Sequence, residues 1–337
     1  MKKLFFIITA TLVLTACGGG KDTVQTNVDQ AMRDYFPLTS NANYHYESPA
    51  GADFTQDVYI TYVNGNYIQR RAATAKVENT EVLRIQDGAV TFIYGDPHYY
   101  FYEDITSAAP NNAMVLLKEP FEKGQKWTQD ATGQCEITGM DVPAATPSGD
   151  YKAMEVTTTF SDGRSQKEYY AKGVGLVKTV YKTTDGNEIE ISLSRIDKNA
   201  SLTVQANFYY PKDGQPQGFG VDQRDININT NCDLVKIFNE QMKTAGSGGY
   251  VWLPGDTAIN SITVDRANDI LIADFSDNTG VNTQNGLQAV ANTLGRFYGV
   301  SKVRPTVKGG DYKAEGKTYG PADALTVIAE PDQAAGG

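Results

Sequence analysis

Alternating side chains between residues 35 and 198 constrain the fold of this chain more than any other feature. Short runs rich in Val, Ile, Tyr and Thr exchange apolar and polar residues at each step, as at residues 58–63, 90–94 and 188–193. A period of two residues is the signature of a strand with one buried face. We therefore predict an antiparallel all-β domain over residues 35–198, built as a sandwich or an open barrel.

Dipeptides between these runs support the same interpretation. Asn and Asp followed by Gly tolerate the positive φ angles that tight hairpins require. Four such dipeptides separate the predicted strands: Asn64-Gly65, Asp87-Gly88, Asp162-Gly163 and Asp185-Gly186. No helical stripe of useful length occurs in this part of the chain. The turns therefore predict that neighbouring strands are joined as a meander.

The pattern changes near residue 200, where strands begin to alternate with two amphipathic helices. Apolar residues at helical spacing form one stripe over residues 234–242 and another over residues 287–297, and Gly299 is the expected C-cap of the second helix. Strand-like runs lie before, between and after these stripes. This order predicts a second domain over residues 200–328, an α/β layer with two helices on a mixed sheet. The whole chain is thus predicted to be an α+β protein of two domains.

The first 17 residues have the layout of an export signal that ends in a cysteine. Lys2 and Lys3 precede an uncharged apolar run over residues 4–14, which is shorter than the roughly 20 residues that a membrane-spanning helix needs. The run leads into Leu14-Thr15-Ala16-Cys17, which resembles the bacterial lipobox. This resemblance implies a diacylglyceryl group on the Cys17 thiol, and two acyl chains anchor a protein durably. We therefore predict a lipid-anchored, extracytoplasmic protein.

The segments that flank the two domains have compositions typical of unfolded chain. Three glycines and a polar stretch predict a flexible tether over residues 18–34. Residues 329–337 are predicted to be a disordered tail. The domains would therefore stand off the membrane at the end of a tether.

Charge and cysteine content exclude several classes of partner and cofactor. The chain has 40 acidic and 30 basic residues, and loss of Lys2 and Lys3 would leave a net charge of about −12. Such a surface repels nucleic acid, which is therefore not an expected partner. Cys135 and Cys232 fall in different predicted domains, without Cys-x-x-Cys spacing or a nearby His. We predict two separate thiols and no zinc site.

Several segments of the C-terminal half together resemble the GerMN domain of bacterial sporulation and spore-germination lipoproteins. They occur in the family's order: Asn207-Phe208-Tyr209-Tyr210-Pro211, Leu253-Pro254-Gly255-Asp256-Thr257, Ala273-Asp274-Phe275-Ser276, Ala291-Asn292-Thr293-Leu294 and Val300-Ser301-Lys302-Val303. These are turn and packing residues rather than reactive groups. The resemblance implies a non-catalytic envelope module, in some members part of an assembly at the membrane. This chain carries one copy, whereas the best-known members carry two.

The N-terminal half is similar to a β domain found in assorted bacterial lipoproteins. That domain opens with Phe36-Pro37-Leu38 and the aromatic pair of Tyr44-His45-Tyr46, and it closes with the phrase at residues 169–175. The resemblance implies no reaction.

Few residues in the chain point to catalysis. The two histidines, His45 and His98, both lie among aromatic residues in segments with a strand-like pattern, where histidine ordinarily has a structural role. Ser247 has a glycine on each side, but a helix precedes it and an extended segment follows, the reverse of a nucleophile elbow. We predict that the protein is not an enzyme.

A loop rich in acidic and amide side chains invites a metal interpretation. Asp274, Asp277 and Asn278 are followed by Gly280, but the spacing does not match an EF-hand. A solvated connection between a strand and a helix explains the loop better. We expect no metal and no cofactor other than the lipid on Cys17.

The densest aromatic segment contains Tyr99, Tyr100, Phe101 and Tyr102. Such rings could form a flat face that binds a glycan or peptide, although strand alternation would send about half of them into the core. Two functions of different class follow. The first is an envelope lipoprotein whose GerMN-like domain contacts unidentified envelope proteins. The alternative is glycan or peptide binding on the aromatic face.

Overall fold

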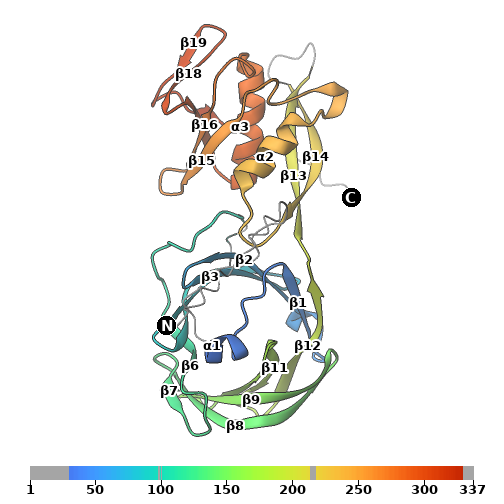
Figure 1. Ribbon diagram of the computed structural model, residues 1–337, viewed down its shortest axis with the longest axis vertical. Coiled ribbons are helices and arrows are strands. Elements are labelled where there is room, and N and C mark those ends of the chain that lie inside the picture. Colours follow the sequence, from blue (N-terminus) through green and yellow to red (C-terminus); the bar gives the residue numbers. More distant parts are fainter. Residues whose placement is uncertain (1–29, 98, 100, 213–217, 329–337) are drawn as a thin grey trace, which may run out of the picture.

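The N-terminal half is a single antiparallel sheet of twelve strands that curves until it is nearly closed (Figure 1). The computed structural model describes residues 30–97, 99, 101–212 and 218–328. In space the strands follow the order β6-β5-β4-β3-β2-β1-β12-β11-β10-β9-β8-β7. The antiparallel all-β prediction is confirmed, and of its two alternatives the structure has the open barrel. The strands are β1 Ala42–Glu47, β2 Gln56–Asn64, β3 Tyr67–Ala73, β4 Glu78–Gln86, β5 Ala89–Asp96, β6 Met114–Lys118, β7 Lys126–Thr128, β8 Gly133–Thr146, β9 Gly149–Phe160, β10 Ser165–Ala171, β11 Gly175–Lys182 and β12 Glu188–Lys198.

Two contacts draw together the edge strands β6 and β7, which are consecutive in the chain. The main-chain nitrogen of Val115 donates to the oxygen of Gln129 at 2.9 Å. The indole nitrogen of Trp127 donates to the oxygen of Val115 at 3.0 Å. These bonds satisfy polar groups that an open edge would leave to solvent. The two edges therefore face each other across a narrow seam.

A short helix, α1 (Gln30–Tyr35), lies within the ring of strands (Figure 1). Its residues Met32 and Tyr35 are buried, with Met32 only 1% exposed, and they belong to the same core cluster as Ile68 on β3. The main-chain nitrogen of Gly173 donates to the oxygen of Asp34 at 2.7 Å and ties the helix to the end of β10. The tether predicted over residues 18–34 was therefore too long at its C-terminal end. Burying an apolar side chain offsets the entropy of ordering this segment.

The C-terminal half contains a two-stranded ribbon, two helices and a mixed sheet. The ribbon is formed by β13 and β14, and the mixed sheet follows the order β15-β16-β17-β18-β19 with β20 beside β17. Strands β16 and β17 run parallel, whereas the other pairs are antiparallel. This confirms the predicted α/β layer with a mixed sheet. Its elements are β13 Leu202–Pro211, β14 Phe219–Ile228, α2 Leu234–Lys243, β15 Ile259–Asp265, β16 Ile270–Phe275, α3 Gln284–Tyr298, β17 Lys302–Val307, β18 Gly310–Ala314, β19 Lys317–Tyr319 and β20 Leu325–Thr326, with a 3-10 turn at Ser247–Gly249. In the N-terminal half, a 3-10 turn at Ala52–Phe54 precedes β2.

Both predicted helices are present and are capped by polar side chains. The carboxylate of Asp233 accepts from the nitrogen of Lys236 at 3.0 Å, and the hydroxyl of Thr283 accepts from the nitrogen of Gly286 at 3.0 Å. Each bond satisfies an orphan donor of the first turn. Gly299 ends α3 in the left-handed conformation with φ 59°, as predicted. Among the described residues, no helix has both the length and the apolar character needed to cross a membrane.

Polar contacts hold the two halves together where β12 leads into β13. The hydroxyl of Tyr59 donates to the oxygen of Ile228 at 3.2 Å, and the amide oxygen of Asn231 accepts from the nitrogen of Val63 at 2.7 Å. The hydroxyl of Thr230 donates to the oxygen of a residue on β2 at 2.8 Å. The loop before α2 is therefore hydrogen-bonded to β2 at several residues.

Candidate functional site

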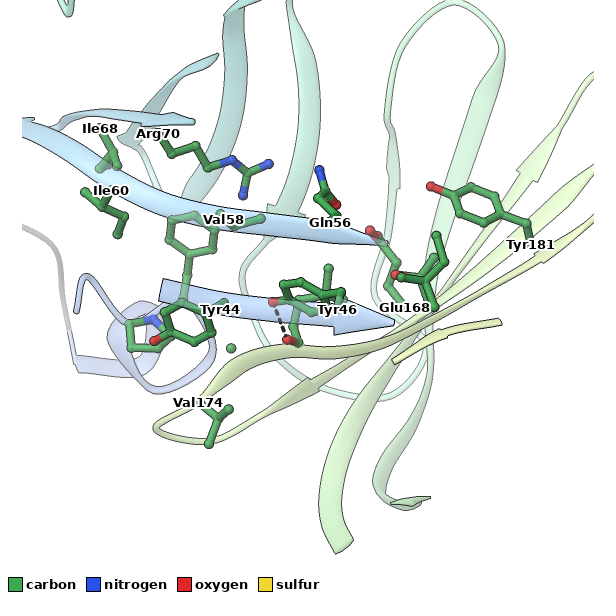
Figure 2. A pocket seen from close by; sticks show the side chains of 16 residues that line it. Tyr44, Tyr46, Gln56, Val58, Ile60, Ile68, Arg70, Glu168, Val174 and Tyr181 are labelled. Carbon is green, nitrogen blue, oxygen red and sulfur yellow. Dashed lines mark hydrogen bonds between the residues drawn. The ribbon is translucent and has the colours of Figure 1, made fainter. Parts of the chain in front are cut away.

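A cavity of about 270 Å³ lies on the inner face of the twelve-stranded sheet (Figure 2). Strands β1, β2, β3, β10, β11 and β12 form its walls, and the segment that follows α1 lies at one end. Most of the lining is apolar or aromatic, with a few polar groups pointing inward. Such a composition is typical of small-molecule sites. The lining residues are Phe36, Pro37, Tyr44, Tyr46, Gln56, Val58, Ile60, Ile68, Arg70, Glu168, Val174, Gly175, Leu176, Thr179, Tyr181 and Ile191.

The strand register explains why these residues converge. Residues directly opposite each other on neighbouring strands share one face of a sheet. Tyr44 lies opposite Val58, and Ile60 lies opposite Arg70. On the far wall Glu168 lies opposite a threonine of β11. The inward faces of these strands therefore supply the cavity lining, from a single side chain on β12 to three on β2.

Arg70 brings the only cationic side chain of this lining, and its charge is already paired. Glu81 is its cross-strand partner on β4, with 2.5 Å between Nε and Oε2. The two side chains are 27% and 13% exposed, so the pair is largely withdrawn from water. Asn79 donates a further hydrogen bond to Glu81 at 2.7 Å. Charge-assisted bonds in this setting are strong and fix the guanidinium in place.

Glu168 brings a carboxyl group that makes no salt bridge with any cation among the described residues. Burial raises the pKa of this carboxyl to about 7, while hydrogen bonds with the Tyr170 and Gln166 side chains and the charge of Arg70 oppose the rise. Desolvation disfavours the charged form of an acid, and here it outweighs the three opposing effects. The group therefore changes its protonation state near neutral pH while it remains inside the sheet.

Tyrosine rings make up much of the remaining wall. The hydroxyl of Tyr46 donates to the oxygen of Leu176 at 2.9 Å, and that of Tyr44 donates to Thr39 Oγ1 at 3.1 Å. Burial raises the pKa of both phenols, so both stay neutral. Tyr181 is 40% exposed and marks the mouth of the cavity. A second hollow adjoins it there and is lined by further apolar residues, including Phe54, Phe160 and Ile189.

The aromatic segment that the sequence singled out lies between the two halves of the molecule. The Arg266 guanidinium lies 4.1 Å from the ring centroid of Phe101 and 5.6 Å from that of Tyr99. The Tyr102 ring lies 5.9 Å from that of Phe297 on α3. Tyr100 lies outside the described residues. The three described rings are partly buried and contact the C-terminal half rather than forming an open stacking face.

Part of this segment also lines a hollow at the junction. Phe101 and Tyr102 form one side of a space of about 500 Å³, and β13 with the end of α3 forms the other. Arg296 lies on the α3 side. The predicted aromatic residues are thus brought together with residues of the second half.

The predicted lipidation site and one histidine lie outside the described residues: Cys17 and His98. The other histidine, His45, bridges two carboxylates on neighbouring strands. Its Nδ1 contacts Asp57, and its Nε2 lies 2.7 Å from Asp197 Oδ2. Ser194 donates its hydroxyl to the main-chain oxygen of His45 at 3.1 Å, not to the ring. The contacts of His45 therefore tie β1 to β2 and β12 without presenting a nucleophile to the imidazole.

The two cysteines in the folded halves are free thiols in separate places, as predicted. Cys135 is buried and lies 3.1 Å from Thr158 Oγ1, and burial raises its pKa to about 11. Cys232 lies 3.9 Å from the hydroxyl of Tyr62 at the junction. Neither thiol is activated for chemistry, because burial favours the protonated form.

Metal ligands do not gather in the part of the chain that the structure describes. No group of three or more His, Cys, Asp or Glu side chains is placed to hold an ion there. In the acidic loop, Asp277 accepts hydrogen bonds from Thr279 and Thr257 at 2.6 and 2.8 Å. These bonds lower the pKa of Asp277, and they give the residue a structural role in organising the loop.

The sequence analysis missed Arg70 and Glu168, which give the cavity its charge. Both are charged residues at inward positions of strands within the predicted all-β domain, in the segments YIQRRAA and SQKEYYA. A second signal was available in the resemblance of the N-terminal half. The sequence segments that open and close the similar β domain meet at the cavity, where Pro37, Tyr46 and Gly175 all form part of the wall.

Comparison with known families identifies the C-terminal half. Residues 207–313 match the family model described as Germane: Sporulation and spore germination, so this part of the chain carries a Germane domain. This is the GerMN-type domain that the sequence predicted. None of the curated proteins matches the chain.

Solved structures with some similarity come from three bacteria. A Bacteroides fragilis protein with a YmcC-like fold, described as exported, is 12% identical, with a TM-score of 0.32, over 49% of this chain and 99% of its own. A Parabacteroides distasonis protein described as a lipoprotein is 13% identical, with a TM-score of 0.31, over 48% and 97%. A Clostridium perfringens protein described as a lipoprotein is 19% identical, with a TM-score of 0.20, over 38% and 93%.

Proposed function

We propose that the protein is a non-catalytic lipoprotein of the cell envelope that presents its Germane domain to another envelope protein. The N-terminal signal and the lipobox-like Leu14-Thr15-Ala16-Cys17 support the anchor and the extracytoplasmic location. The Germane match over residues 207–313 supports an envelope role, because its description concerns sporulation and spore germination.

The observation that carries the proposal is the way in which the Germane domain is fixed to the twelve-stranded sheet. Arg266 donates from Nε to Glu103 Oε1 at 2.9 Å while its guanidinium packs on two aromatic rings. The buried Tyr59 hydroxyl reaches the main chain of β14 from the other half. A domain held in one orientation loses little freedom when it binds, which favours specific contact with a partner.

The lipid anchor is tested by replacing Cys17 with Ala and separating membranes from soluble material. The wild-type protein is expected in the membrane fraction and the variant in the soluble fraction, because the thiol is the acceptor of the lipid. Replacing the buried Cys135 with Ala controls for loss of a cysteine as such and should leave the protein on membranes. A Cys17→Ala variant that stays on membranes would contradict the anchor.

The fixed orientation is tested by measuring distances between spin labels on the two halves. Lys167 on β10 and Lys236 on α2 are both exposed and accept cysteine substitutions after Cys17 and Cys232 are replaced by Ser. One narrow distance distribution is expected. A broad distribution in the otherwise unaltered chain would remove the support that the junction gives to the proposal.

A second candidate function is small-molecule binding in the sheet cavity. The observation that favours it is the mixed lining, in which Arg70 and Glu168 face apolar and tyrosine side chains. The aromatic face proposed for glycan or peptide contributes instead to the junction. Titration with small apolar probes tests this candidate, and a complete lack of binding would exclude it.

A further inference from the structure

The charges of Arg70, Glu81 and Glu168 around the cavity do not balance. Arg70 and Glu81 form a close pair and cancel each other. Glu168 then remains as a carboxyl group that forms no salt bridge with a cation in the described part of the chain, and only the more distant charge of Arg70 acts on it. When this group ionises, the cavity carries one negative charge in a largely apolar lining. A buried charge without a partner is costly, so a ligand that supplies the opposite charge is favoured.

The walls beside Glu168 suit a positively charged ligand. Tyr44, Tyr46 and Tyr181 bring three neutral rings to the same cavity, from β1 and β11 (Figure 2). The faces of such rings attract cations, and the attraction strengthens where water is excluded. The hydroxyl groups of Tyr44 and Tyr46 are bonded to the protein, which leaves the ring faces to contact a ligand.

We propose that this cavity binds a small organic cation, an amine with an apolar body, whose ammonium group pairs with Glu168 against the tyrosine rings. The inference rests on the second candidate function, namely that the cavity binds a small molecule. The apolar body would pack on Val58, Ile60 and neighbouring side chains of the opposite wall.

An anionic ligand fits the same site less well. Its charge would have to pair with Arg70, which already contacts Glu81. Even with Glu168 protonated, the cavity would then hold one uncompensated negative charge. With a cation bound and Glu168 ionised, the charges of Arg70, Glu81, Glu168 and the ligand sum to zero. Charge balance therefore distinguishes the two ligand classes.

Three probes with similar apolar bodies test the proposal: 2-phenylethylamine, 2-phenylethanol and phenylacetate. Calorimetric titration of the Cys17→Ala protein at about pH 8 should show the amine binding about tenfold more tightly than the alcohol, the scale of one charge-assisted bond. The Glu168→Gln variant should lose this preference while it keeps its circular dichroism spectrum. Glu122→Gln, which changes an exposed carboxylate, should keep the preference.

The pH dependence provides a second measurement that needs no variant. The groups that face Glu168 are Tyr170 on β10, Tyr181 on β11, Cys135 on β8 and Arg70 on β3. The phenols and the thiol keep their protons, and the guanidinium stays charged, between about pH 5.5 and pH 8. The preference for the amine should therefore weaken towards pH 5.5, as Glu168 gains a proton.

The outcomes separate two claims, namely that the cavity binds a small molecule and that this molecule is a cation. Equal binding of the three probes, or tightest binding of phenylacetate, would overturn the cation assignment and leave small-molecule binding in place. No binding of any probe would overturn both. An amine preference that persists in Glu168→Gln would place the cation elsewhere on the protein and refute the assignment.

Discussion

Replacing Glu168 with Gln should make the protein more stable above neutral pH, because the native state holds this carboxyl in an environment that opposes its ionisation. Its pKa is raised from the ordinary value of 4.5 to about 7 by burial. Between these two values the folded chain keeps the proton and the unfolded chain loses it. Since the folded state then binds more protons, its stability falls as pH rises through this window.

The size of the effect follows from the same two values. Each pH unit in the window changes the free energy of unfolding by about 1.4 kcal/mol, so the full loss is about 3 kcal/mol. This is an upper bound, because Glu168 retains some contact with solvent in the cavity. Gln cannot ionise and keeps a similar shape, so the variant should escape the loss.

Urea denaturation of both proteins at about pH 4.5 and about pH 8 measures the difference directly. The variant should match the wild type within about 1 kcal/mol at the lower pH and exceed it by about 1–3 kcal/mol at the higher pH. Glu122→Gln, at an exposed position, should show no such change. Equal stabilities at both pH values, or a variant that is weaker at pH 8, would refute the argument that Glu168 is held unfavourably.

Three further substitutions test packing and the junction, each read as the free energy of unfolding from denaturant titration. Met32→Ala should cost about 2–5 kcal/mol, because α1 places this side chain in the core, and a loss below about 1 kcal/mol would show that the helix is not docked. Gly299→Ala should cost more than Gly316→Ala, since both have positive φ but only at residue 299 does a new methyl group meet the aromatic segment; equal losses would contradict that close contact. A double-mutant cycle of Arg266→Ala and Glu103→Ala should give a coupling of about 0.5–3 kcal/mol, and a value near zero would mean that this pair does not join the halves.

Local sequence patterns predicted much of the fold correctly. The dipeptide Asp87-Gly88 joins β4 to β5 with both residues at positive φ, which is what its composition predicts. The stripe ending at Phe297 and its cap at Gly299 define α3 closely. Such features depend on neighbours in the chain, so the sequence displays them directly.

Features that depend on distant contacts were not predictable in the same way. Closure of the sheet requires β6 and β7 to meet, and nothing local in either strand specifies that contact. The helix α1 has only six residues and is stable through the burial of Met32 and Tyr35. From sequence alone, this segment resembles the rest of the predicted tether, because a short polar segment has no long stripe of apolar residues at helical spacing.

The charged residues of the cavity were hidden for a related reason. On β3, Arg70 stands two residues after Ile68, and both line the cavity, but the alternate residues Gln69 and Arg71 are buried as well. Because polar side chains occupy both faces of this strand, the sequence shows no apolar face that would mark the inward direction. On β10, the segment SQKEYYA likewise carries polar residues on both faces. The inward direction of Arg70 and Glu168 therefore becomes evident only in the folded sheet.

Site-specific photocrosslinking in intact cells tests the central claim most directly. A crosslinking residue at Val221, which is 43% exposed on the Germane domain, should capture a discrete envelope protein. The same residue at Tyr67, which is 37% exposed on the twelve-stranded sheet, should not capture that protein. Capture that depends on Val221 and is lost when Cys17→Ala releases the chain from the membrane is the result expected. No adduct at either position, or the same adducts from both, would contradict a role of the Germane domain in partner contact.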